Sequence, residues 1–145
     1  MSRAVCFDRE LCLPLLLEHL PGRPSAEDFG SDFHCIGFLR GGTLEAAALF
    51  SGFQGFNVFF SIAAVSPSWA TRANFRVICE FAFGELGVER ITACVPGTSR
   101  NVHQLATRWG FRFEGIRRKG WDGNVDLFEF GMLRGECRWL QQAKD

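Results

Sequence analysis

The stretch at residues 56–96, FNVFFSIAAVSPSWATRANFRVICEFAFGELGVERITACVP, decides the fold because it reads as a strand, a helix and a second strand. Its opening run, FNVFFSIAAV, has the aromatic and β-branched composition of a strand. The run RANFRVICEFAFGEL then repeats apolar residues at helical spacing. ITACVP is short and wholly apolar, which is typical of a strand in the middle of a sheet beside a parallel neighbour. A β-α-β unit is therefore predicted.

The residues before this stretch predict a helix and then a meander of strands. Asp8 is a typical N-cap, and apolar residues at helical spacing predict a helix over residues 9–20 that a Pro-Gly pair ends. From residue 34 the pattern changes to β-compatible runs separated by two glycine-containing turns. Three antiparallel strands within residues 34–65 are the simplest interpretation.

The residues after it predict a second helix and a hairpin. Residues 98–109 have a helical pattern, and Gly110 is suited to the left-handed position that closes a helix. Two strands then flank a turn that contains Asp-Gly, within residues 112–133, and a tail follows. The expected fold class is α/β (α+β), a mixed and mainly antiparallel central sheet flanked by helices, in a single domain over residues 1–145. Its parts are the helix 9–20, the meander 34–65, a loop and helix 66–86, a strand, helix and hairpin 90–133, and the tail 134–145.

Composition excludes several classes of protein. With 145 residues the chain is long enough for one buried core and too short for two ordinary domains. Sixteen basic and sixteen acidic residues give no net field that would attract nucleic acid or an anionic membrane. The apolar run of residues 11–17 is interrupted by Pro14, and it is shorter than the roughly 20 residues of a membrane span. We expect a soluble, cytoplasmic protein, with a homodimer left open.

The cysteines and histidines do not predict a metal site or a disulfide framework. The six cysteines form no CxxC pair, and most of them lie in apolar runs such as VICEF and ITACV, where cysteine is usually a small buried hydrophobe. None of the three histidines has metal-ligand spacing with another histidine or an acid. We therefore expect no metal.

The loop at residues 66–73 is the first candidate for ligand binding. It follows the carboxyl end of a predicted strand and leads into the N-terminus of a predicted helix. Backbone N–H groups at a helix N-terminus have no partner within the helix, and the helix dipole favours an anion there. The loop is therefore a candidate phosphate site.

The order of these elements resembles the GNAT superfamily of acetyl-CoA-dependent N-acetyltransferases, and more closely its phage- and prophage-encoded members. The resemblance covers about residues 34–140 and rests on Trp69 to Ala73 in the loop, Gly110–Phe111 after the second helix, and Gly115 in the next strand. It implies that acetyl-CoA is the co-substrate and that an amine is the acceptor. The identity of that acceptor stays open.

The resemblance also implies where coenzyme A binds. In the family a loop of pattern Q/R-x-x-G-x-G/A wraps the pyrophosphate, and the matching hexapeptide here, SWATRA, fits only at its last small residue, Ala73. Thr71 and Arg72 offer a hydroxyl and a cation to phosphate instead. The pantetheine arm would pair with the end of the meander, near the start of the second helix. The implied cofactor-binding residues are Ile62, Ala63, Ala64, Val65, Trp69, Ala70, Thr71, Arg72, Ala73, Ser99 and Asn101.

The catalytic residues that the family often uses are missing from this chain. Where relatives often have a tyrosine that protonates the leaving thiolate, this chain has Ala106, and it contains no tyrosine at all. The meander strand FNVFFSIAAV contains no acid. Aminolysis of a thioester needs a neutral amine, stabilisation of the oxyanion and a proton for the sulfur. His103 and Ser61 are the remaining candidate catalytic side chains.

Several alternatives stay open at this point. Three functions are compatible with the sequence. The chain is an active N-acetyltransferase, a GNAT fold that binds without turnover, or a phage-type protein that acts through its surface on a partner. Cys94 is a nucleophile or, more commonly in such a strand, a buried apolar residue. The basic residues Arg112, Arg117, Arg118 and Lys119 are the solvated side of an edge hairpin or contacts for an acidic acceptor or the CoA 3′-phosphate. Trp121 is a partner contact or an ordinary turn residue.

Overall fold

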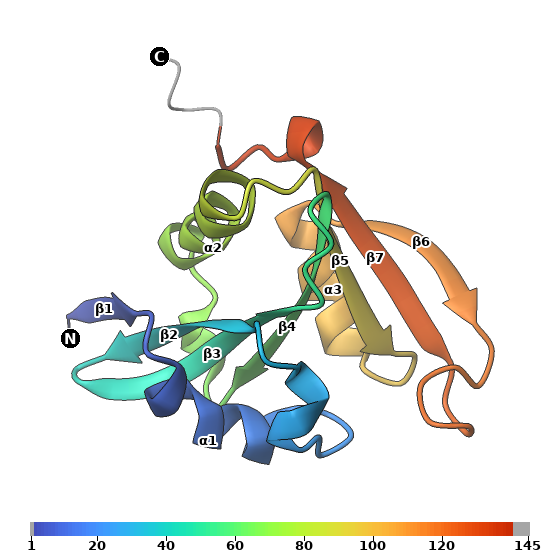
Figure 1. Ribbon diagram of the computed structural model, residues 1–145, viewed down its shortest axis with the longest axis horizontal. Helices are drawn as coiled ribbons and strands as arrows, with labels where there is room; N and C mark the ends of the chain where they lie inside the picture. The colour runs from blue at the N-terminus through green and yellow to red at the C-terminus, as the bar shows by residue number, and fades with distance from the viewer. Residues whose placement is uncertain (1, 141–145) are drawn as a thin grey trace.

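The computed structural model describes residues 2–140 and contains one seven-stranded sheet in the order β1-β2-β3-β4-β5-β7-β6 (Figure 1). Every neighbouring pair is antiparallel except β4 and β5, which are parallel. The mixed, mainly antiparallel sheet confirms the predicted fold class. The strands are β1 (Arg3–Cys6), β2 (His34–Arg40), β3 (Thr43–Ser51), β4 (Asn57–Ala64), β5 (Arg90–Pro96), β6 (Arg112–Arg117) and β7 (Leu127–Leu133).

Helix α1 (Arg9–His19) covers one face of the first half of the sheet. It begins as predicted at Asp8, whose carboxylate accepts hydrogen bonds from the N–H groups of Glu10 and Leu11. Its buried residues Cys12 and Leu16 pack with apolar residues of β2, β3 and β4 in one core cluster. The alternation of each strand therefore sends one set of side chains toward α1 and leaves the other set for the opposite face.

Helices α2 (Arg72–Cys79) and α3 (Arg100–Trp109) cover that opposite face and enclose the larger core cluster. This cluster is rich in aromatic rings, and the stacked pair Phe75 and Trp109 has ring centroids 4.9 Å apart. Gly110 closes α3 in the left-handed conformation, with φ of 108°, as the sequence predicts. Trp139 packs back on this core against Phe75 and Trp109, so the described part of the tail joins the domain.

Two features differ from the sequence-based prediction. The edge strand β1 was not predicted, because its four residues are mostly exposed and show no alternation of burial. The predicted fifteen-residue helix is α-helical only over its first part: α2 ends at Cys79, and a π-helical segment continues it over Glu80–Glu85.

All six cysteines are free thiols. None of the helices within residues 2–140 is both long enough and apolar enough to cross a bilayer.

Candidate functional site

The site begins where the two parallel strands at the centre of the sheet separate. β4 and β5 pair over only three residue pairs, the last of which is Phe59 with Thr92. Beyond this point β4 continues to Ala64 and β5 continues to Pro96 without pairing to each other. Alternate residues of β4 direct their backbone groups toward β5, as Phe56 does when its carbonyl accepts from the N–H of Arg90. The backbone groups of Ile62 therefore face the open gap.

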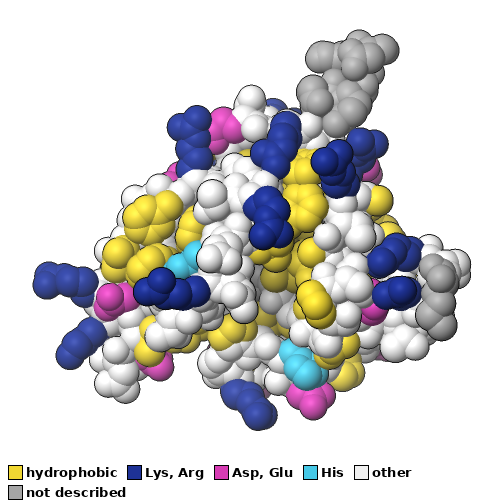
Figure 2. Space-filling model, turned by 180° about the vertical axis from the view of Figure 1, so that it is seen from behind, with side chains coloured by type: hydrophobic (Ala, Val, Ile, Leu, Met, Phe, Trp, Pro, Cys, Tyr) yellow, Lys and Arg dark blue, Asp and Glu magenta, His cyan; other side chains and the backbone are white. Residues whose placement is uncertain are grey.

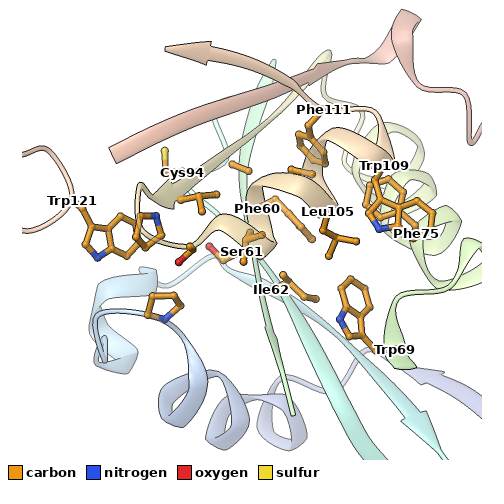
Figure 3. A pocket seen from close by; sticks show the side chains of 17 residues that line it. Phe60, Ser61, Ile62, Trp69, Phe75, Cys94, Leu105, Trp109, Phe111 and Trp121 are labelled. Atoms are coloured by element: carbon orange, nitrogen blue, oxygen red, sulfur yellow. The ribbon is translucent and has the colours of Figure 1, made fainter. Parts of the chain in front are cut away.

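A cavity passes through this gap (Figure 3). Its empty volume, including the open mouth, is about 730 Å³, and none of its lining side chains carries a charge. Such an apolar channel with a few hydroxyl groups is typical of a small-molecule site. The lining residues are Pro21, Phe60, Ser61, Ile62, Trp69, Phe75, Ala93, Cys94, Val95, Pro96, Ser99, Val102, Leu105, Ala106, Trp109, Phe111 and Trp121.

The two ends of the cavity lie on opposite faces of the sheet. Phe60 and Ile62 belong to the core on the α2 and α3 face, where Trp69 and Leu105 complete the wall. Ser61 alternates to the other face of β4. Figure 3 shows Trp121 at the far end of the cavity from Trp69. A ligand in the cavity would therefore be reached from both faces of the sheet.

The loop between β4 and α2 contributes Trp69 to the cavity wall and then leads into the first turn of α2. Thr71 is the N-cap of α2, and its hydroxyl accepts from the N–H of Asn74 at 3.1 Å. The N–H of Thr71 itself donates to the carbonyl of Trp69 at 2.8 Å. The N–H groups of Arg72 and Ala73 belong to the first turn and have no acceptor within the helix. These two groups and the exposed Arg72 side chain are the part of the loop for which the sequence predicts phosphate binding.

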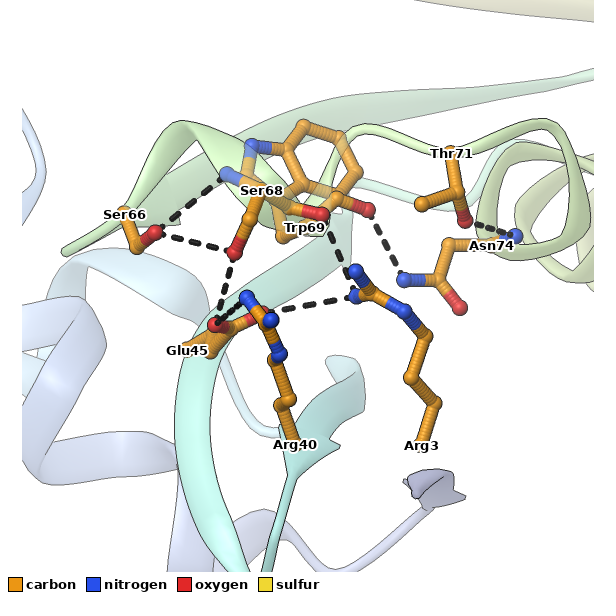
Figure 4. A network of polar contacts seen from close by, with 8 residues as sticks. All are labelled: Arg3, Arg40, Glu45, Ser66, Ser68, Trp69, Thr71 and Asn74. Atoms are coloured by element: carbon orange, nitrogen blue, oxygen red, sulfur yellow. Dashed lines mark hydrogen bonds and ion pairs between the residues drawn. The ribbon is translucent and has the colours of Figure 1, made fainter. Parts of the chain in front are cut away.

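A buried carboxylate anchors this loop to the sheet (Figure 4). The hydroxyl of Ser68 donates a hydrogen bond to the carboxylate of Glu45 in β3, with 2.7 Å between Oγ and Oε2. Arg3 and Arg40 lie 3.6 and 3.9 Å from the same carboxylate, and Arg3 also donates to the carbonyl of Ser68 at 3.1 Å. The position of the loop is therefore fixed by charged residues from three strands of the sheet.

The structure brings together some of the residues that the sequence singled out and separates others. Ser61, Ile62, Trp69 and Ser99 line the cavity, together with Ala106. The remaining implied cofactor residues do not line it: Ala63 is buried beneath α1, Ala70 and Thr71 are half-buried in the loop, and Ala64, Val65, Arg72, Ala73 and Asn101 are exposed. His103 lies outside the lining, where its ring stacks on Phe128 and its Nε2 lies 3.0 Å from the carbonyl oxygen of Pro96.

Sequence reasoning missed most of the aromatic wall and the mouth. Trp109 and Phe111 line the cavity, and a helical-face pattern in residues 98–109 was the available signal for the first. Trp121 lies at the mouth near Gly22, because a Cβ on Gly22 would come within 3.8 Å of its ring. Nothing local predicts that the hairpin loop meets the turn after α1, since the two segments are about a hundred residues apart. Trp121 is therefore a cavity residue and more than an ordinary turn residue.

Cys94 lies at the gap in a charged neighbourhood. It is half-buried and lines the cavity. Burial raises the pKa of its thiol, the nearby Glu129 carboxylate raises it further, and Arg117 acts in the opposite direction. A thiol with a raised pKa is a poor nucleophile near neutral pH. The structure therefore favours the apolar interpretation of Cys94 over the nucleophilic one.

The likeness to solved structures identifies the fold. No protein-family model matches the sequence, and no curated protein matches it. Among solved structures, an N-acetyltransferase from Staphylococcus aureus Mu50 aligns with 92% of this chain and 99% of its own at 13% identity and a TM-score of 0.73. A GNAT family acetyltransferase from Elizabethkingia anophelis with acetyl-CoA bound aligns with 90% and 97% at 11% identity and a TM-score of 0.70.

A third match is more local. A probable acetyltransferase aligns with 72% of this chain at 21% identity and a TM-score of 0.64, and the chain spans 64% of the length of that protein, which is less than two thirds. Because all of these identities are low, the likeness establishes the fold. The fold is that of the GNAT acetyltransferases.

Proposed function

We propose that this protein is an N-acetyltransferase that transfers the acetyl group of acetyl-CoA to a primary amine by direct attack. The observation that carries the proposal is the gap between β4 and β5, which an apolar cavity fills from one face of the sheet to the other. Such a channel lets a thioester on one face meet an amine from the other face. The acetyl-CoA-bound relative of the same fold supports the choice of co-substrate.

The residues of the α2 and α3 face suit coenzyme A. The N–H groups of Arg72 and Ala73 would hold phosphate oxygens, and the Arg72 guanidinium would add a cation. Trp109 lines the cavity, and its buried Nε1 has no hydrogen-bond partner among residues 2–140, so it can donate to a pantetheine amide oxygen. Figure 2, which views the side turned away in Figure 1, shows a central band of hydrophobic side chains with Lys and Arg side chains beside it. Apolar and cationic groups together match a cofactor with an apolar arm and anionic phosphates.

Aminolysis of the thioester needs few catalytic side chains when the protein holds the amine and the thioester carbonyl in contact. The backbone N–H of Ile62 faces the gap and would stabilise the oxyanion when the amine attacks the thioester carbonyl. The C–N bond forms, the C–S bond breaks, and one amine proton goes to the departing thiolate. The hydroxyl of Ser61 lies at the gap and would relay that proton with water. Holding the two reactants together is itself worth several powers of ten in rate.

The proposal is tested by titration calorimetry with acetyl-CoA and with CoA. Ala106→Trp would fill the cavity, whereas Thr107→Trp puts the same ring on an exposed neighbouring position of α3. We expect the wild type and Thr107→Trp to bind both ligands and Ala106→Trp to lose at least about tenfold in affinity, or about 1.4 kcal/mol. A wild type that binds neither ligand would overturn the proposal.

A second titration locates the phosphate end. Arg72→Glu places a negative charge beside the free N–H groups of α2, and Arg76→Glu makes the same change one turn later on the exposed side of the helix. Because the effect of a charge on a helix terminus is confined to the terminal turn, Arg72→Glu should weaken CoA binding by about tenfold and Arg76→Glu by much less. Equal losses would argue against phosphate at this loop.

A second candidate function is a GNAT fold that binds CoA without turnover, in line with the phage-type reading of a protein that acts through its surface. The absence of tyrosine from the chain favours it, as does Ala106 at a cavity position where relatives often have that tyrosine. Thioester consumption in the presence of a panel of primary amines separates the two functions. Any amine-dependent release of CoA above the rate without protein rules out the non-catalytic candidate.

A further inference from the structure

A groove opens beside the gap on the face of the sheet that α1 covers only in its first half. Cys94 lines both the cavity and this groove, so the two adjoin at its side chain. In Figure 1 no helix is drawn in front of β5 and β7, and α3 lies behind β5. We call this the β5–β7 groove; it is lined by Phe56, Asn57, Phe59, Arg90, Thr92, Cys94, Arg117, Leu127 and Glu129.

The groove contains a carboxylate, Glu129, and a guanidinium, Arg117, that have no direct ion-pair partner within residues 2–140, although the Glu129 carboxylate helps to raise the pKa of Arg90. Glu129 of β7 lies directly opposite Cys94 of β5. Arg117 of β6 lies directly opposite Leu127 of β7, which is two residues before Glu129 and therefore on the same face of the sheet. Neither Glu129 nor Arg117 forms an ion pair or a side-chain hydrogen bond within residues 2–140. Arg90 differs, because Glu114 holds its guanidinium at 2.8 Å.

The distances along the ladder place both charges within reach of one small ligand. Directly opposed residues of an antiparallel pair have Cβ atoms about 5 Å apart, and diagonal neighbours about 7–8 Å. Glu129 is therefore beside the thiol of Cys94, and Arg117 is one diagonal step further. The effects of both charges on the Cys94 thiol agree with this placement. An unpaired anion and cation so close together suit a ligand that carries both charges.

The rest of the groove is apolar. Phe56 and Phe59 are 59% and 37% exposed, and both line the groove together with its polar and charged side chains. Exposed apolar side chains that gather at a concave surface are typical of a site that contacts a ligand or partner. Leu127 completes the apolar part on the side of β7. The ligand therefore has an apolar body as well as two charges.

We propose that the β5–β7 groove is the acceptor site and that its acceptor is a hydrophobic α-amino acid. The ammonium group lies at Glu129, the carboxylate at Arg117, and the side chain against Phe56 and Phe59. The proposal rests on the proposed function, because that function places the thioester at the gap beside Cys94. A polyamine is disfavoured, since its second ammonium would meet Arg117 in place of a carboxylate.

Glu129 also completes the proton balance of the transfer. The ammonium has three protons: Glu129 takes one, which frees the lone pair of the nitrogen for attack on the thioester carbonyl. The C–N bond forms and the C–S bond breaks. A second proton goes to the thiolate of CoA, and the third stays on the amide. Glu129 therefore binds the amine and serves as its base.

The test compares the binding of three amines to the full-length protein by titration calorimetry. L-phenylalanine, phenethylamine and spermidine are titrated into the wild type, Glu129→Gln, Arg117→Gln and the control Arg118→Gln, whose exposed side chain lies outside the groove. We expect phenylalanine to bind most tightly. Arg117→Gln should lower the affinity for phenylalanine by about tenfold and leave the affinity for phenethylamine unchanged. Glu129→Gln should lower both affinities by about tenfold, as is usual for loss of a charge-assisted hydrogen bond. Arg118→Gln should change neither.

The same variants titrated with acetyl-CoA keep the two proposals separate. If phenylalanine binds through Glu129 while acetyl-CoA does not bind, the groove is an amino-acid-binding site without a role as acceptor site, and the proposed function fails. If acetyl-CoA binds but spermidine is the tightest amine, or Glu129→Gln binds every amine as the wild type does, the groove proposal is overturned and the proposed function stands.

Discussion

Ser68 and Glu45 join two parts of the chain that are distant in sequence through a 2.7 Å hydrogen bond from the serine hydroxyl to the carboxylate. Glu45 is only 9% exposed, and its charge is balanced by Arg3 and Arg40. A carboxylate in this position is stable only when its oxygens are paired. The loop that carries the proposed phosphate site is therefore held by a buried charged cluster on the first half of the sheet.

Ser68→Ala should destabilise the protein and weaken CoA binding together. The hydroxyl bonds a buried carboxylate, and loss of such a hydrogen bond costs about 1.5–3 kcal/mol. Urea unfolding measures the first effect and calorimetry the second. Ser51→Ala is the control, because the Ser51 hydroxyl makes no side-chain hydrogen bond within residues 2–140. An unfolding midpoint equal to that of the wild type would show that the cluster does not anchor the loop.

Trp139 should contribute strongly to stability although it lies in the tail. Its ring packs against Trp109 at 4.8 Å between centroids, and its Nε1 donates to the Trp109 carbonyl at 2.8 Å. Trp139→Ala should cost about 3–5 kcal/mol, as is usual for removal of a buried aromatic ring. Trp139→Phe keeps a ring and loses the hydrogen bond, so it should cost about 1–3 kcal/mol. Thermal unfolding of both variants measures the two losses of stability. Equal losses would contradict the prediction that Trp139→Ala is the more destabilising change.

Ala106→Tyr should transfer acetyl groups faster than Ala106→Phe. Ala106 lines the cavity, and a phenol there would supply the proton that the thiolate needs. Because Ala106→Phe adds nearly the same volume without the hydroxyl, the ratio of the two turnover rates isolates the proton donor. We expect a ratio of at least about tenfold, within the range for general acid catalysis. A ratio near one would mean that water or Ser61 already protonates the sulfur adequately.

The alkylation rate of Cys94 should report the charges of the β5–β7 groove. Burial and Glu129 raise the pKa of the thiol, so the reactive thiolate is scarcer at pH 8 than for a free cysteine. Glu129→Gln removes a negative charge, lowers that pKa and should speed the reaction with iodoacetamide. Arg117→Gln removes a positive charge and should slow it. Mass spectrometry of the modified Cys94 peptide measures both rates, and changes of the opposite sign would show that neither charge faces the thiol.

The sequence predicted the elements that depend on local signals. Asp8 caps its helix, Gly110 closes α3, and the apolar strand ITACVP is central and has one parallel neighbour, all as expected from short-range patterns. The short edge strand β1 was missed because its stability comes from pairing with β2 and not from its own four residues. The interruption of α2 by a π-helical segment likewise has no clear local signal.

The candidate site was predicted only in part, for the same reason. The family resemblance placed Ile62 beside the pantetheine arm and Trp69 in the phosphate loop, and both residues line the cavity. Trp121 and Glu129 could not be placed in this way, since their positions follow from the fold of the final hairpin and from its register against β5. A shift of one residue in that register would turn Glu129 away from Cys94 to the other face.

The sequence by itself determined the order of strands and helices from α1 onward, the helix caps at Asp8 and Gly110 and the absence of tyrosine, because these depend on residues near one another in the chain. Only the tertiary structure decided that β4 and β5 separate after three pairs, that the side chains lining the resulting cavity are uncharged, and that Glu129 and Arg117, which have no ion-pair partner among residues 2–140, line the adjoining groove. The physical reason is that strand pairing and its register are contacts between distant segments, which no local pattern encodes.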